Sequence, residues 1–149
     1  MLAFGLPIGS KFVDWRNGSY EEIAGRFDWP FEGICFDIEN NSFWPQSWGA
    51  KPVELAEAFA VAKERVNNAP RLVPICSHRY IPSRPNEAGN PVFSVYQTDI
   101  IVYGNDLFDY FNNEFGSRKM QRSGVGEIEK RIEFWSDIVD WNNSLIDEI

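Results

Sequence analysis

The sequence has few of the residues that build metal and redox sites. In 149 residues it holds one histidine, His78, and two cysteines, Cys35 and Cys76. This set cannot supply the four soft ligands of a tetrahedral metal site, and two cysteines are too few for a disulfide framework. We therefore expect no bound metal, and we interpret both cysteines as small core residues in a reducing compartment.

Several other signatures are missing. No apolar run approaches the roughly 20 residues that a membrane-spanning helix needs. The apolar amino terminus lacks the basic lead-in and the cleavage site of a secretory signal, so we expect a cytoplasmic protein with no membrane association. The phosphate-binding patterns GxGxxG and GxxxxGK followed by Ser or Thr are absent, as is the GxSxG nucleophile elbow. These absences argue against the enzyme classes that the motifs mark.

Basic side chains are also in the minority. The chain has 22 acidic and 14 basic residues, which gives a net charge of -8. Such a charge repels nucleic acid and attracts a basic protein. The cluster SRKMQR at 117–122 is too small to reverse this balance, so we expect no nucleic-acid binding. The alternative interpretation is that the acidity only keeps the protein soluble.

Two residue pairs have spacings that catalytic sites use. Cys76 and His78 are two residues apart, so in a strand both side chains lie on one face. A nucleophilic pair of this kind also needs an electropositive pocket and an orienting group. Asp37 and Glu39 alternate in the same way, a spacing that serves glycosidases and also occurs on any half-exposed strand. We favour the non-catalytic interpretation of both pairs and predict no catalytic residue.

The amino-terminal third predicts two short helices and a strand. The first helix spans about 7–16 and ends at an Asn-Gly pair. A capping-box pattern of Ser19 with Glu22 starts a second helix, which we expect to end at Pro30. Alternating apolar and polar residues within 31–50 then indicate a strand followed by an aromatic loop.

The rest of the chain predicts helices on both sides of a block of strands. Strands are indicated by β-branched and aromatic residues bounded by Pro, Gly or Asn, and helices by apolar residues at helical spacing. The predicted helices span 52–69, 105–116 and 124–149, and the predicted strands span 71–81, 91–98 and 99–104. The last helix is long and amphipathic. This order indicates a single α+β domain over 1–149, with helices flanking a central, mainly antiparallel sheet.

Four motifs follow one another along the chain. They are FWPQSWG at 43–49, HRYIP at 78–82, GNPVFSV at 89–95 and TDIIVYG at 98–104. With the residues around them, over about 28–115, they resemble the SUKH superfamily. That family includes a fungal cell-wall-assembly regulator and many bacterial proteins, a large share of them immunity proteins of polymorphic toxin systems.

The resemblance implies an α+β fold with no established catalytic activity and no required cofactor. It implies a non-catalytic binding protein, and for bacterial members one that neutralises a cognate toxin, often a nuclease, by direct binding. A basic nuclease would complement the net charge of -8. The alternative is a regulatory or scaffold module with housekeeping partners. A third possibility, from another class, is an enzyme or small-molecule-binding domain.

The excess of acidic side chains also predicts where a partner binds. We expect acidic residues on the first strand to carry the contact, with tryptophans of the following loop as aromatic anchors. The alternative role for these tryptophans is to brace the loop or the core. Two acidic residues on the helix after TDIIVYG are a second choice. The predicted partner-binding residues are Asp37, Glu39, Trp44, Trp48, Asp106 and Asp109.

The run HRYIP contains the only histidine of the chain. We predict a structural role for His78, Arg79 and Tyr80. His78 or Arg79 should hydrogen-bond a carboxylate or a backbone carbonyl and fix the strand to the loop that follows it.

Overall fold

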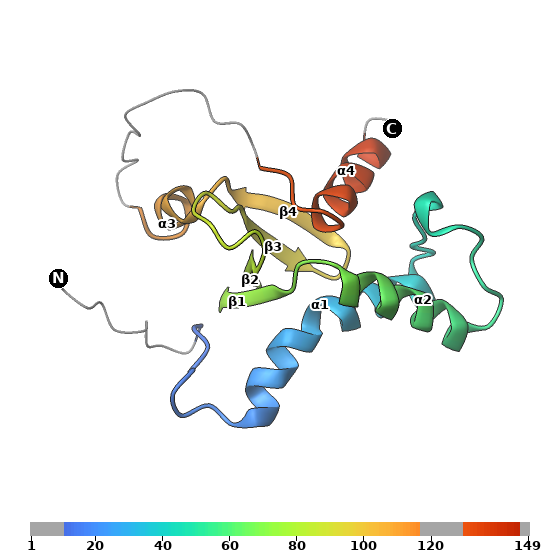
Figure 1. Ribbon diagram of the computed structural model, residues 1–149, viewed down its shortest axis with the longest axis horizontal. Coiled ribbons are helices and arrows are strands. Elements are labelled where there is room, and N and C mark those ends of the chain that lie inside the picture. Colours follow the sequence, from blue (N-terminus) through green and yellow to red (C-terminus); the bar gives the residue numbers. More distant parts are fainter. Residues whose placement is uncertain (1–10, 117–129, 147–149) are drawn as a thin grey trace.

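The computed structural model describes residues 11–116 and 130–146, and Figure 1 shows the arrangement of its helices and strands. The described residues form four α-helices, one 3-10 helix and four strands, which confirms the predicted α+β class. In chain order these elements are α1 (Tyr20–Asn40), η1 (Gln46–Trp48), α2 (Leu55–Asn68), β1 (Leu72–Cys76), β2 (Arg79–Pro82), β3 (Val92–Tyr96), β4 (Asp99–Gly104), α3 (Leu107–Phe115) and α4 (Trp135–Ile146).

The four strands form one antiparallel sheet in the order β1-β2-β3-β4, so each strand pairs with the next one along the chain. Two-residue turns join β1 to β2 and β3 to β4. The first residue of each turn, Ser77 or Gln97, has a positive φ of 49° or 56°. Tight turns of this kind usually use glycine or asparagine at such positions. Because Ser77 gives no such signal, the prediction of one strand over 71–81 was wrong.

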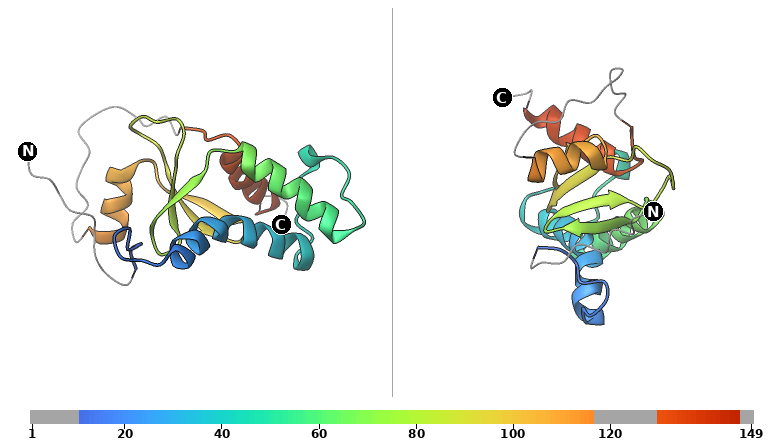
Figure 2. Two further views of the ribbon diagram at one scale, coloured as in Figure 1. Left: turned by 60° about the horizontal axis from the view of Figure 1, so that its bottom comes forward. Right: turned by 90° about the vertical axis from the view of Figure 1, so that its left-hand side faces the viewer.

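One apolar core joins helices α1, α2 and α4 to the sheet. A second, smaller cluster connects α3 with β1 and β3 through Tyr110, Cys76 and Val92. Figures 1 and 2 show α3 at one end of the sheet and α2 at the other. The largest fully buried side chains of the main core are Trp135, Tyr80, Phe43, Phe93, Ile34, Ile38, Ile100 and Ile132.

Helix α1 continues through Pro30, where the sequence predicted its end, so the predicted strand within 31–50 is wrong and residues 31–40 are helical. A proline inside a helix has no N–H for the carbonyl four residues earlier, and it usually costs about 3 kcal/mol. Here that carbonyl belongs to Arg26, and the hydroxyl of Tyr80 donates to it at 2.8 Å. A tertiary contact from β2 therefore replaces the missing helical hydrogen bond.

The environment of Tyr80 keeps this replacement bond intact. Tyr80 is only 1% exposed, so its hydroxyl is shielded from water and directed to the carbonyl of Arg26. Burial raises the pKa of Tyr80 to about 12, while the positive charge of Arg26 acts in the opposite direction. The hydroxyl is therefore protonated at neutral pH and can act as the donor.

The start of α1 agrees with the sequence, because the Ser19–Glu22 capping box is present. The predictions over 52–69, 91–98, 99–104 and 105–116 correspond to α2, β3, β4 and α3. The carboxy-terminal prediction is corrected: α4 begins only at Trp135, and residues 130–134 are not helical.

The predicted helix at 7–16 is also wrong where it can be compared, because residues 11–16 form no helix. Its first part lies outside the described residues. So does the basic connector at 117–123.

Candidate functional site

Asp37, predicted to bind a partner, is instead buried at 4% exposure. The prediction placed Asp37 and Glu39 on one face of a strand, but in a helix residues two apart point in nearly opposite directions. The Asp37 side chain faces inward and accepts hydrogen bonds from Thr98 N at 2.8 Å, Thr98 Oγ1 at 2.6 Å and Asn41 Nδ2 at 2.6 Å. Glu39 is exposed on the outer side of α1.

The hydrogen bonds of Asp37 hold the β3–β4 turn. Thr98 is the second residue of that turn, directly after Gln97 with its positive φ. The carbonyl of Thr98 also accepts a hydrogen bond from Asn142 Nδ2 on α4 at 2.6 Å. Asp37 thus links α1, the turn and α4, which is an architectural role.

Trp44 and Trp48, the predicted aromatic anchors, are partly buried against the main core. Their rings meet at 5.2 Å in a T-shaped contact, and Trp48 stacks on Phe134 with 6.1 Å between ring centroids. Trp44 Nε1 donates to the carbonyl of Gly49 at 2.8 Å. These contacts match the alternative given for both tryptophans, in which they brace the loop.

Asp106 and Asp109 lie at the start of α3. Asp106 is the N-cap residue, and its side chain accepts a hydrogen bond from Asp109 N at 3.0 Å. Both residues are partly buried. Since α3 lies at one end of the sheet and Glu39 lies near the carboxyl end of α1, the structure does not bring the two predicted acidic groups together (Figure 1).

The HRYIP run connects three elements of the fold. Arg79 donates to Ser94 Oγ at 2.7 Å and pairs with the carboxylate of Glu114 on α3 at 3.4 Å. Its guanidinium also lies 3.7 Å from the ring centroid of Tyr103. Arg79 therefore contacts a carboxylate, as predicted for either Arg79 or His78, but this carboxylate belongs to α3 and not to the loop after β2. Tyr80 bonds α1 as described above.

His78 lies in the turn after β1 rather than in a strand. Its Nδ1 is 3.1 Å from Ser77 Oγ, and its backbone carbonyl accepts from Val95 N at 2.9 Å. Burial lowers the pKa of His78, and Arg79 lowers it further, whereas Glu114 acts in the opposite direction. Cys76 ends β1 and is buried, so the shared strand face expected for Cys76 and His78 does not form.

The structure also bears on metals and membranes. Among the described residues, no group of three or more His, Cys, Asp or Glu side chains is arranged to hold a metal ion. No helix within residues 11–116 and 130–146 combines the length and hydropathy that crossing a bilayer requires.

A surface that the sequence did not predict lies on the outer side of α1. Trp29, Phe36 and Tyr96 are 44%, 48% and 58% exposed, although large apolar side chains usually lie inside. They line a shallow groove of about 190 Å³. Trp29 is held in place because its Nε1 donates to the carbonyl of Val95 at 3.3 Å and its ring meets Tyr96 at 6.5 Å.

Gly33 lets the two sides of this groove approach each other. A Cβ at Gly33 would lie 2.6 Å from the Cα of Gln97, closer than packed atoms allow. The missing side chain therefore lets α1 cross directly over the β3–β4 turn. This crossing brings Tyr96 from the sheet beside Trp29 and Phe36 from the helix.

Acidic residues follow the same side of the helix. At about 100° of rotation per residue, the exposed Glu21, Asp28, Glu32 and Glu39 fall within a sector of about 40°. Glu32 also lines the groove. We call the set of Trp29, Glu32, Phe36, Glu39 and Tyr96 the acidic–aromatic face.

The helical spacing of Trp29, Glu32, Phe36 and Glu39 is present in the sequence. It was not recognised because the helix was expected to stop at Pro30. Tyr96 belongs to this face only because β3 packs beside α1 in the folded protein. No pattern in the sequence around Tyr96 predicts this position.

Comparisons with known proteins leave the family open. No protein-family model, no curated protein and no solved structure matches this chain. The resemblance to the SUKH superfamily therefore stays a prediction.

Proposed function

We propose that this protein is a non-catalytic binding protein that holds a basic protein partner on its acidic–aromatic face. In this proposal it is an immunity protein that neutralises a cognate toxin domain in the cytoplasm. One observation carries the proposal: three exposed aromatic side chains and two exposed carboxylates share a groove and its edge on one side of α1.

The aromatic part of the face would supply most of the affinity. Tryptophan and tyrosine are frequent among the few interface residues that dominate binding energy. Trp29 already has a fixed orientation through its hydrogen bond to Val95 and its contact with Tyr96. Little side-chain freedom would be lost when a partner covers these rings, and this reduces the entropic cost of association.

The acidic part would supply attraction and orientation. Glu32 and Glu39 lie beside the rings, and the whole chain carries a net charge of -8. Exposed charges at the edge of an interface mainly raise the association rate and select partners of opposite charge. The partner surface that fits is therefore basic, with apolar positions at its centre.

Such a partner suggests how neutralisation would work. A nuclease needs a basic surface to hold the phosphates of its substrate. An acidic protein bound to that surface would exclude the nucleic acid by occupying the same cationic groups. No catalytic group of this chain takes part in such a mechanism.

The test uses the toxin domain encoded by the gene immediately upstream, if one is present. Co-expression of the two proteins should protect cells. In surface plasmon resonance, Phe36→Ala with Tyr96→Ala should weaken binding by about 30-fold or more, the loss expected when hot-spot rings are removed. Glu32→Lys with Glu39→Lys should slow association by about ten-fold at low salt, and the difference should shrink at high salt.

The matched control is Glu54→Lys with Glu57→Lys, which changes the net charge equally at exposed positions three residues apart near the start of α2. It should slow association much less than the Glu32 and Glu39 pair. If both charge reversals slow association equally, the attraction comes from the net charge of the whole molecule, and the acidic–aromatic face is not the binding surface. If cells die despite co-expression, the immunity function is wrong. A gene without a toxin neighbour would favour the regulatory alternative.

A further inference from the structure

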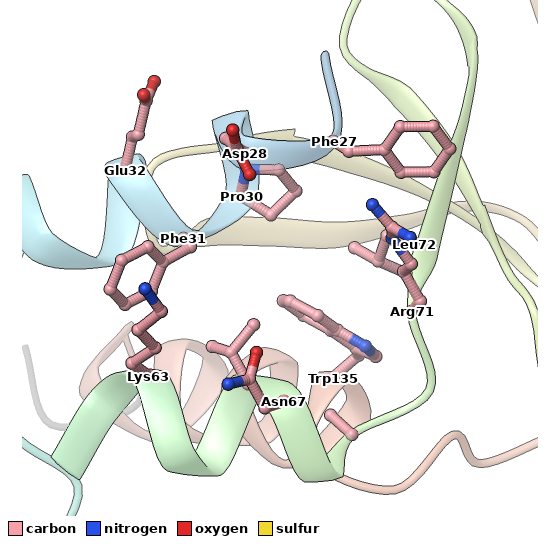
Figure 3. A pocket seen from close by; sticks show the side chains of 12 residues that line it. Phe27, Asp28, Pro30, Phe31, Glu32, Lys63, Asn67, Arg71, Leu72 and Trp135 are labelled. Carbon is pink, nitrogen blue, oxygen red and sulfur yellow. The ribbon is translucent and has the colours of Figure 1, made fainter. Parts of the chain in front are cut away.

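A second cavity lies on the other flank of α1, between α1 and α2, and has a volume of about 630 Å³ (Figure 3). Its accessible apolar surface includes Phe31 and Val66, and the almost fully buried Leu72 and Trp135 lie beneath them. Small-molecule sites typically have volumes of about 300–1,000 Å³ and combine apolar walls with a few polar groups. The cavity has the size and lining of such a site.

Charged groups of opposite sign line different walls. Asp28 comes from α1, while Lys63 and Asn67 come from α2 and Arg71 precedes β1 (Figure 3). Glu32 also borders the cavity, but its carboxylate points away from it in Figure 3. Within the described part of the chain, neither Asp28 nor either cation forms an ion pair with another described residue.

The two cations are held over aromatic rings at the cavity wall. The Arg71 guanidinium lies 4.1 Å from the ring centroid of Phe27, and Lys63 Nζ lies 5.9 Å from that of Phe31. Both rings line the same cavity. These cation–π contacts limit the positions that each side chain occupies and leave its N–H groups available to a ligand.

We propose that this cavity binds a small zwitterion: an α-amino acid, or a short peptide with free ends, that carries an apolar side chain. Its ammonium group pairs with Asp28, its carboxylate pairs with Lys63, and its side chain packs on the partly buried Phe31 and Val66. A ligand that is only anionic is disfavoured by the net charge of -8, and one that is only cationic meets two positive groups. A zwitterion satisfies both walls together.

The proposed ligand contacts are separate from the proposed partner binding, because none of them belongs to the acidic–aromatic face, although Glu32 of that face borders both the groove and the cavity. The first experiment needs only the unmodified protein. Isothermal titration calorimetry with L-phenylalanine, L-leucine and the dipeptide Phe-Leu should give saturable binding, with a dissociation constant of about 0.1–1 mM for the best ligand. The unfolding temperature should rise with the concentration of that ligand.

Analogues of L-phenylalanine that lack one charge test the pairing. N-acetyl-L-phenylalanine has no ammonium group and L-phenylalaninamide has no carboxylate. Each should bind about ten-fold more weakly, because a hydrogen bond to a charged group is lost. The proposal is wrong if no ligand saturates up to about 10 mM, or if both analogues bind as well as the amino acid.

Substitutions then place the ligand. Asp28→Asn and Lys63→Met should each weaken the binding of L-phenylalanine by about ten-fold. Asp28→Asn should leave the affinity for N-acetyl-L-phenylalanine unchanged. The matched control is Arg65→Met, which removes a positive charge from the same helix at a position that does not line the cavity. Equal losses for Lys63→Met and Arg65→Met would move the binding site elsewhere.

Discussion

The hydroxyl of Tyr80 replaces the helical donor that Pro30 lacks, and this makes a strong prediction about stability. Tyr80→Phe removes one oxygen atom and leaves the part-buried carbonyl of Arg26 without its donor. Stranding a buried hydrogen-bonding group costs about 1–3 kcal/mol. We expect Tyr80→Phe to lower the free energy of unfolding by about 2 kcal/mol, a large part of the roughly 5–15 kcal/mol that stabilises a typical domain.

A double-mutant cycle isolates the cause. In Pro30→Ala the new N–H of residue 30 can donate to the carbonyl of Arg26, as in an ordinary helix. Tyr80→Phe should therefore cost only about 0.5 kcal/mol in that background, which gives a coupling of about 1.5 kcal/mol. Urea unfolding followed by far-ultraviolet circular dichroism measures all four proteins, and the m-values should agree.

The control for this cycle is Tyr96→Phe, which removes a hydroxyl from a residue that is mostly exposed. Its free energy of unfolding should stay within about 0.5 kcal/mol of the original. Additive effects of Tyr80→Phe and Pro30→Ala, within about 0.3 kcal/mol, would refute the replacement of one donor by the other.

Two further predictions concern α1 and also use unfolding free energies. Asp37→Ala removes the acceptor of three hydrogen bonds and should lower the free energy of unfolding by about 2–4 kcal/mol. The control, Glu39→Ala at an exposed position, should lower it by less than about 0.5 kcal/mol. Equal losses would contradict the buried role of Asp37. Gly33→Ala places a Cβ 2.6 Å from the Cα of Gln97 and should destabilise the protein by about 1–3 kcal/mol. Gly25→Ala meets no atom within 4 Å and should stabilise it by up to about 1 kcal/mol; a loss for Gly25→Ala would contradict this assignment.

The sequence by itself determined the elements whose signals are local. The capping box of Ser19 with Glu22 marks the start of α1, because its hydrogen bonds join residues three positions apart. Helix α2 follows from its apolar spacing. Strands β3 and β4 follow from β-branched and aromatic runs. Together these elements were enough to predict an α+β fold, and the net charge was enough to motivate a basic partner.

Tertiary structure alone decided the course of α1 and therefore the candidate surface. Pro30 would end an isolated helix, but Tyr80 donates to Arg26 across 54 residues of sequence, and no pattern around Pro30 reveals that bond. The continued helix turns Asp37 inward and leaves Glu39 outside. The same holds for the turns at Ser77 and Gln97, whose positive φ lacks a glycine signal. A conformation that costs energy locally is adopted when contacts distant in sequence stabilise it more, and those contacts exist only in the folded protein.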